Sequence, residues 1–330
     1  MFASLKRAGK SNRSSSAAKR CCMKSLLVGL VFFIAVVPSL VGQKRTDGLT
    51  NDYKVAVNVD LVIFNVTVTN SKGRLVKALS KDDFRIVEDG RQQEIQLVSP
   101  EDIPATVGLL IDNSGSMHRK QADVIGAALA FAASSNPQDE IFVVNFNERV
   151  SMGLPAGSPF TSDIDQLRAA LANTRAEGKT ALYDAVAAGL KHLEMGTLQR
   201  KALVLLSDGG DNASGQTEND VFVMAEASNA TIYTIDLDDP DDKDQNPKLL
   251  QDLAKLTGGE AYRPKAIDEL PDVWRKIASG IRSQYTVGYV SKNRSRDGAF
   301  RTVKVIATGK DGKPLHVRAR KGYLAPRSVK

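Results

Sequence analysis

Continuous apolar runs alternate with amphipathic segments through the middle of the chain. Runs without internal polar positions are typical of strands that a parallel sheet buries on both faces. They predict strands at residues 106–111, 140–146, 201–207, 231–237 and 260–263. The segments between them predict helices near residues 120–134, 180–194, 217–229, 246–256 and 268–282. Such alternation indicates crossovers between parallel strands. Residues 103–283 are therefore predicted to form an α/β domain with a doubly wound, mainly parallel sheet.

The two flanks of this region carry a different pattern, in which β-branched residues largely alternate with polar ones. Residues 50–100 contain an extended run, Tyr53 to Thr69, and a predicted hairpin with Asp89-Gly90 as its turn. Residues 284–325 contain three shorter runs, "YTVGYV", "FRTVKVIAT" and "LHVRARKGY". Neither flank has enough strands to close a core alone. We therefore expect the flanks to form one smaller all-β, sandwich-like domain into which the α/β domain is inserted.

Residues 1–42 are predicted to be a signal peptide for export. They hold seven basic and no acidic residues, and the basic part is followed by an apolar run of twelve residues, Leu26–Val37. We interpret Met23 as the true start, because a short charged segment and the apolar run follow it directly. The run is short for a bilayer-spanning helix, and an uncleaved leader that anchors the protein stays open as the alternative. The expected location is extracytoplasmic, either periplasmic or secreted.

The leader also accounts for the cysteines and for the net charge. Cys21 and Cys22 are the two cysteines of the chain, so the exported part would have none, which excludes thiol catalysis and thiolate metal ligands. The formal charge of the chain is +7, but removal of the leader leaves 38 basic residues against 38 acidic ones. We therefore expect no nucleic acid as a partner.

Residues that can carry chemistry gather where the predicted strands end. The first strand of the α/β region runs into Asp112, which Ser114 and Ser116 follow, and a later strand runs into Asp208. Thr180 stands at the start of a predicted helix. The carboxyl ends of parallel strands share the sheet edge where α/β proteins place their sites, so we expect these five side chains to converge. Two carboxylates and three hydroxyls are hard oxygen ligands, which suit Mg²⁺, Mn²⁺ or Ca²⁺ and not zinc or copper.

The pattern Asp112-x-Ser114-x-Ser116, with the separate Thr180 and Asp208, resembles the metal-ion-dependent adhesion site of von Willebrand factor type A domains. The flanks are similar to those of a bacterial exported group built around this domain. The resemblance implies that the three hydroxyls coordinate the ion, while the two aspartates act directly or through water. In this family the ion usually accepts a Glu or Asp carboxylate from a protein partner. The resemblance therefore implies an exported, metal-ion-dependent protein-binding or adhesion module that is not an enzyme.

Two other functions stay open as alternatives. One is a structural envelope protein whose metal site no longer functions. The other is a metal-dependent hydrolase built on Asp112 and Asp208, but hydroxyl ligands give weak support to a metal-bound hydroxide and no general base is evident. His118 has no partners placed for a catalytic triad, and we interpret it as a solvated residue at a helix start.

Four neighbours of the five predicted ligands have open roles. Asn113 and Asp211 are residue types that either support metal ligands or cap helices. Gly115 and Gly209 either permit tight turns close to the ion or serve the backbone conformation alone.

Overall fold

The computed structural model describes residues 61–99, 102–237 and 245–328. These residues belong to one compact unit, Val57–Lys330. The predicted signal peptide at 1–42, including the proposed start at Met23, lies outside the described residues.

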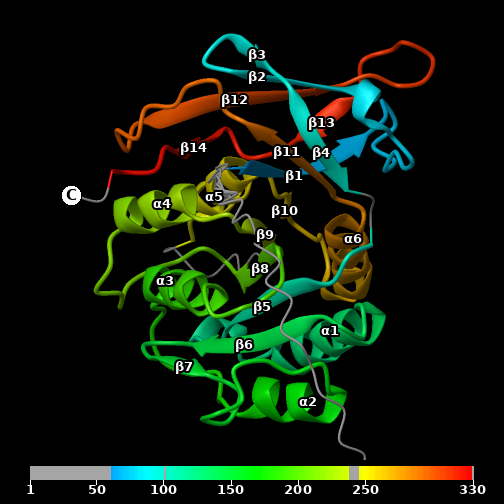
Figure 1. Cartoon of the computed structure of the whole chain (residues 1–330). Coiled ribbons are helices and arrows are strands. Elements are labelled where there is room, and N and C mark those ends of the chain that lie inside the picture. The colour runs from blue at the N-terminus through cyan, green and yellow to red at the C-terminus, as the bar shows by residue number, and fades with distance from the viewer. Residues whose placement is uncertain (1–60, 100–101, 238–244, 329–330) are drawn as a thin grey trace, which may run out of the picture. The chain divides into compact units, whose positions relative to one another are not determined.

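A sheet of six described strands forms the centre of the α/β region (Figure 1). The strands lie in the order β10-β9-β8-β5-β6-β7, and neighbours are parallel except for β7, which runs antiparallel to β6. Every residue of β5 is buried, as expected for a strand covered on both faces. The predicted doubly wound, mainly parallel sheet is thereby confirmed. The six strands are β5 (Ala105–Asp112), β6 (Glu140–Phe146), β7 (Val150–Met152), β8 (Arg200–Ser207), β9 (Thr231–Asp236) and β10 (Ala261–Tyr262).

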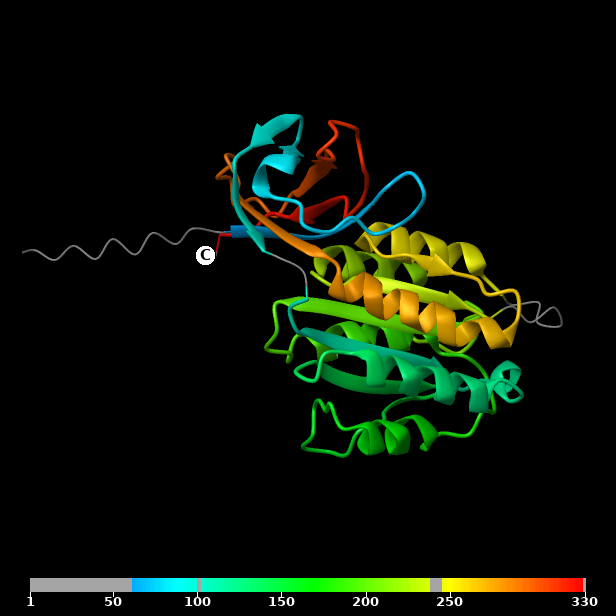
Figure 2. The same ribbon diagram turned by 90° about the vertical axis from the view of Figure 1, so that its right-hand side faces the viewer.

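Six described α-helices cover the two faces of this sheet. Helices α1, α2 and α6 pack together on one face, and α3, α4 and α5 pack on the other (Figures 1 and 2). No helix within the described ranges is long and apolar enough to cross a bilayer. The helices are α1 (Gln121–Ser134), α2 (Ile164–Ala172), α3 (Leu182–Leu193), α4 (Glu218–Ala227), α5 (Pro247–Thr257) and α6 (Leu270–Arg282), and the short 3-10 turns are η1 (Lys81–Asp83), η2 (Gly115–Met117) and η3 (Ile267–Glu269).

The segments on either side of the α/β region pair with one another in two antiparallel sheets. One sheet has the described strands in the order β13-β1-β11-β4, and the other has the order β14-β12-β2-β3. Each sheet thus combines strands from both flanks, and their buried side chains form a second core that includes Phe64, Ile86 and Val287. The strands are β1 (Leu61–Thr69), β2 (Phe84–Glu88), β3 (Arg91–Gln93), β4 (Ile95–Ser99), β11 (Tyr285–Val290), β12 (Phe300–Ala307), β13 (His316–Arg318) and β14 (Gly322–Leu324).

The two chain segments that join the β-sheets to the α/β region lie side by side. Asp102, just before β5, accepts two hydrogen bonds from the Arg282 guanidinium at the end of α6, both 2.8 Å long. The Asp102 backbone N–H also donates to the Arg282 carbonyl over 2.7 Å. Buried Arg200, the first residue of β8, donates to the carbonyls of Ile281 and Gln284. These contacts hold the starts of β5 and β8 in place, so both strands run from there towards the same edge of the sheet.

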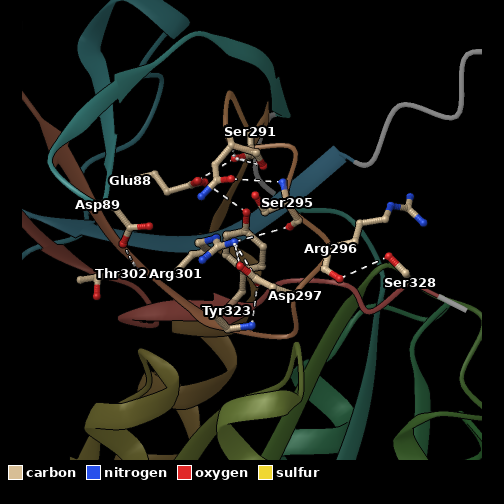
Figure 3. Close-up of polar contacts among 12 residues, drawn as sticks. Glu88, Asp89, Ser291, Ser295, Arg296, Asp297, Arg301, Thr302, Tyr323 and Ser328 are labelled. Atoms are coloured by element: carbon tan, nitrogen blue, oxygen red, sulfur yellow. Dashed lines mark hydrogen bonds and ion pairs between the residues drawn. The ribbon is translucent and has the colours of Figure 1, made fainter. Parts of the chain in front are cut away.

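A buried carboxylate organises one end of the β-sheets (Figure 3). Glu88 is 2% exposed and accepts hydrogen bonds from the hydroxyls of Tyr289, Ser291 and Tyr323 over 2.6, 2.6 and 3.1 Å. No basic side chain of the described residues is hydrogen-bonded to it. Three hydroxyl donors from β11, β14 and the segment after β11 therefore solvate this charge in place of water.

Candidate metal site at the carboxyl edge of the sheet

The two predicted aspartates lie on neighbouring strand ends. Asp112 is the last residue of β5, and Asp208 directly follows β8. β5 and β8 are parallel and in register, with Ile111 opposite Leu206, so both aspartates lie at the same edge of the sheet. Each is 1% exposed. The edge therefore holds two carboxylates that have almost no contact with bulk water.

Two serines connect these aspartates by hydrogen bonds. The Ser114 backbone N–H donates to Asp112 Oδ1 over 2.8 Å, which bends the chain sharply as it leaves β5. The hydroxyls of Ser114 and Ser116 are 3.1 Å apart, and the Ser116 hydroxyl donates to Asp208 Oδ2 over 3.1 Å. Four of the five predicted ligands thus form one continuous hydrogen-bonded chain.

Thr180, the fifth predicted ligand, lies in an adjoining loop. The loop contacts the serine turn through the Gly115 N–H, which donates to the Gly178 carbonyl over 3.1 Å. Asn212, four residues after Asp208, accepts a hydrogen bond from the Thr180 N–H and donates one to the Thr180 carbonyl, each 2.9 Å long. The Thr180 side chain is 7% exposed, and its hydroxyl makes no hydrogen bond to any described residue. The structure therefore places the Thr180 loop against the serine turn and the segment after Asp208, without a hydrogen bond from the Thr180 hydroxyl to the other four predicted ligands.

Burial dominates the electrostatics of Asp112. Removal from water raises the pKa of this carboxyl from 3.8 to about 6, against the opposing effect of hydrogen bonds from Ser207 and Ser114. The charge of nearby Asp208 raises the pKa further. Two like charges at a dry sheet edge repel each other, and a cation bound between them would lower this repulsion.

The donor set fits a hard divalent cation. All five side chains offer oxygen, and Mg²⁺, Mn²⁺ and Ca²⁺ prefer oxygen ligands. Among the described residues no group of three or more His, Cys, Asp and Glu side chains gathers as a metal-binding cluster. Only the two aspartates among the five predicted ligands belong to these residue types, so metal binding at this edge would also require the hydroxyls of the two serines and the threonine.

The neighbours of the ligands now have defined contacts. Asn113 does not cap a helix: its amide donates to the carbonyl of Ile111 and to Asn145 Oδ1, and accepts from Gln121. Asp211 is not the N-cap residue of a helix either, since Ala181 is the N-cap of α3, but from its own loop its Oδ1 accepts from the Tyr183 N–H in the first turn of that helix over 3.2 Å. Both side chains thus fix loops that carry predicted ligands.

The two glycines differ in what the backbone requires of them. Gly209 has φ +84°, and a Cβ there would lie 2.5 Å from the Asn246 carbonyl oxygen. A Cβ at Gly115 would make an ordinary contact of 3.5 Å with the Gly178 carbonyl oxygen. The turn after Asp208 therefore requires glycine at position 209, whereas the turn after Asp112 has room for a Cβ at position 115.

Ser207 is a residue of the site that the sequence pattern did not indicate. Its hydroxyl donates to Asp112 Oδ2 over 2.6 Å, and its side chain is fully buried. The contact depends on the register of β5 against β8, which a sequence pattern does not reveal. A hydroxyl residue directly before a strand-end aspartate is the one signal that could have pointed to it.

Comparison with protein families identifies the α/β region. The family model of the von Willebrand factor type A domain matches residues 107–210, which contain all five predicted ligands. The chain therefore contains a von Willebrand factor type A domain, as the resemblance implied. Proteins that carry this domain are mostly protein-interaction modules. A comparison with curated proteins finds no match.

Solved structures of such domains resemble this chain at low identity. A von Willebrand factor type A protein from Catenulispora acidiphila has 15% identity and a TM-score of 0.49, covering 82% of this chain and 74% of that chain. The vWF domain of the type V pili tip protein Mfa5 from Porphyromonas gingivalis has 15% identity and a TM-score of 0.46, covering 55% and 95%. Proximal thread matrix protein 1 from the mussel byssus, in a structure with a zinc-occupied MIDAS motif, has 15% identity and a TM-score of 0.45, covering 54% and 48%. The chain thus spans about half the length of the mussel protein.

Proposed function

We propose that Asp112, Ser114, Ser116, Thr180 and Asp208 bind one divalent cation of the Mg²⁺ type, with Mn²⁺ or Ca²⁺ as alternatives. The observation that carries this proposal is the hydrogen-bonded chain from Asp112 through Ser114 and Ser116 to Asp208. It joins two buried carboxylates at neighbouring strand ends through the Ser114 backbone N–H and the hydroxyls of Ser114 and Ser116, which are metal ligands by type. The uncommitted hydroxyl of Thr180 in the adjoining loop supplies the fifth oxygen.

The proposed ion serves to bind a protein partner. Three of its five ligands are neutral hydroxyls, so the ion keeps an affinity for an additional anion. A Glu or Asp side chain of a partner protein supplies that anion, as the resemblance to von Willebrand factor type A domains implies. The chain then acts outside the cytoplasm as a metal-dependent protein-binding or adhesion module, and the basic and apolar pattern of residues 1–42 supports the export.

The proposal includes no catalytic step. His118, the imidazole nearest in sequence to the site, is exposed. His192 lies on α3, where its ring bonds to the Pro159 carbonyl over 2.8 Å and packs on Phe142. His316 belongs to β13 in the β-sheets. None of the three imidazoles makes a hydrogen bond to a predicted ligand within the described residues.

Titration calorimetry with Mg²⁺ and Mn²⁺ tests the metal site. The wild type is expected to bind one ion, and Asp112→Ala is expected to lose binding. Asp139→Ala is the matched control, because Asp139 is also a buried aspartate at a strand end, but at the opposite edge of the sheet, where it accepts from the Ala105 and Asn136 N–H groups. Equal affinity of the wild type and Asp112→Ala would overturn the proposed site.

The same variants test the partner. Immobilised wild type, incubated with envelope extract in Mg²⁺, is expected to retain a protein that chelator releases. Asp112→Ala is expected to retain none of it, and Asp139→Ala is expected to behave as the wild type. Retention that is insensitive both to chelator and to Asp112→Ala would contradict a metal-dependent interaction.

A further inference from the structure

We infer that Ser207 is a positioning residue of the metal site, which sets the orientation of Asp112 relative to Asp208; this inference rests on the proposed function. Ser207 is the last residue of β8 and precedes Asp208 in the chain. It lies level with Asp112 across the β5–β8 pairing, one step beyond the matched pair Ile111 and Leu206.

The Ser207 hydroxyl connects the two aspartate-bearing segments. It donates a hydrogen bond to Asp112 Oδ2 over 2.6 Å, a length typical of a hydroxyl donating to a carboxylate. Its oxygen accepts from the Gly209 N–H over 3.1 Å, at the turn that follows Asp208. A single hydroxyl therefore fixes the end of β5 against the loop after β8.

This contact matters because the two carboxylates repel each other before an ion binds. Asp112 has its other oxygen held by the Ser114 N–H, so the two donors together fix the plane of the carboxylate. Without the Ser207 hydroxyl, Oδ2 would lose its donor and only the Ser114 N–H would hold the carboxylate, so metal binding would have to fix an orientation that is preset in the wild type. Groups that orient metal ligands in this way typically change metal affinity by about 10- to 100-fold when they are removed.

The test compares the Mg²⁺ and Mn²⁺ affinities of full-length wild type, Ser207→Ala and Ser207→Thr by titration calorimetry. Ser207→Ala is expected to bind at least about tenfold more weakly. Ser207→Thr is expected to restore the affinity, because it keeps the hydroxyl and its branched side chain suits a strand. Ser207→Cys is close in size to the wild type but has a weak donor, so its affinity is expected to lie between those of Ser207→Ala and Ser207→Thr. It takes the place of Ser207→Thr in the comparison if the added methyl group prevents folding.

A matched control separates positioning from stability. Thr234 of β9 is as buried as Ser207, and its hydroxyl donates to the Leu250 carbonyl over 3.1 Å, away from the predicted ligands. Thr234→Val and Ser207→Ala are both expected to lower the melting temperature without metal, but only Ser207→Ala is expected to lower the affinity. Equal affinities for Ser207→Ala and the wild type would overturn the positioning role and leave the metal site intact. Absence of binding by the wild type would overturn the proposed function, and the inference with it.

Discussion

Replacement of Asp112 by Asn is expected to remove the stabilisation that Mg²⁺ gives, while the metal-free protein keeps nearly its wild-type stability. Asn has almost the same shape as Asp but no charge. The shift in the pKa of Asp112 from 3.8 to about 6 corresponds to a cost of about 3 kcal/mol for burying the charge at neutral pH, since each unit is worth about 1.4 kcal/mol. This net cost already includes the hydrogen bonds from Ser207 and Ser114 to the charged carboxylate. Asn relieves it, but Asn has a single side-chain oxygen, so one of these two buried donors faces the amide nitrogen, and an unsatisfied buried donor costs about 1 to 3 kcal/mol.

The effect of Mg²⁺ on the wild type follows from linkage between binding and folding. At a free Mg²⁺ concentration roughly one hundred times the dissociation constant, the native state gains about 2.7 kcal/mol. Residues 57–330 form one compact unit, and an unfolding entropy of about 2 cal/mol/K per residue converts this gain into a rise of about 5 °C in the melting temperature. Asp112→Asn is expected to show a rise close to zero.

Scanning calorimetry of both proteins in Mg²⁺ and in chelator measures these differences. Asp139→Asn serves as the control: it is expected to melt at a lower temperature in both buffers but to keep the Mg²⁺-dependent rise. An equal rise in Asp112→Asn and the wild type would refute the reasoning. A loss of more than about 4 kcal/mol in metal-free Asp112→Asn would also refute it, because Asp112 would then be a structural residue.

Two further changes test the surroundings of the site and the second core. Gly209→Ala is expected to lower the free energy of unfolding by at least about 2 kcal/mol, because it combines a positive φ with a Cβ 2.5 Å from the Asn246 carbonyl oxygen. Gly215→Ala is the control, since a Cβ there has no neighbour closer than 3.8 Å. Equal losses for the two variants in urea unfolding would contradict this. Tyr289→Phe is expected to cost about 2 kcal/mol, because it removes a hydrogen bond to the buried carboxylate of Glu88, and a loss below about 0.5 kcal/mol in the same assay would show that the other hydroxyls suffice.

The sequence predicted the central sheet because its strands are long, apolar and evenly separated by helices. The predicted strand at 106–111 differs from β5 by one residue at each end, and the predicted helix at 120–134 differs from α1 by one residue. Helix α2 and strand β7 were not predicted. β7 has three residues without a buried side chain, and α2 has nine residues that follow a capping aspartate, Asp163, so neither gives a long periodic signal.

The predicted ligands could be placed at one sheet edge because Asp112 and Asp208 come at the ends of apolar runs. Their mutual contacts could not be predicted, since they depend on how β5 and β8, about ninety residues apart, align in the sheet. The link from Asn212 to Thr180 likewise joins two loops that share no sequence pattern. The domain boundaries at 103 and 283, the ligand set and the leader at 1–42 stay predictions.

The most direct test of the metal site is the position of Mn²⁺ in crystals of the protein, located by anomalous diffraction. One strong peak is expected among the side-chain oxygens of Asp112, Ser114, Ser116, Thr180 and Asp208, at about 2.0 to 2.3 Å from its direct ligands. The peak is expected to be absent from crystals of Asp112→Asn. A peak elsewhere in the wild type, or none in crystals soaked at millimolar Mn²⁺, would contradict the assignment of these five residues as the metal site.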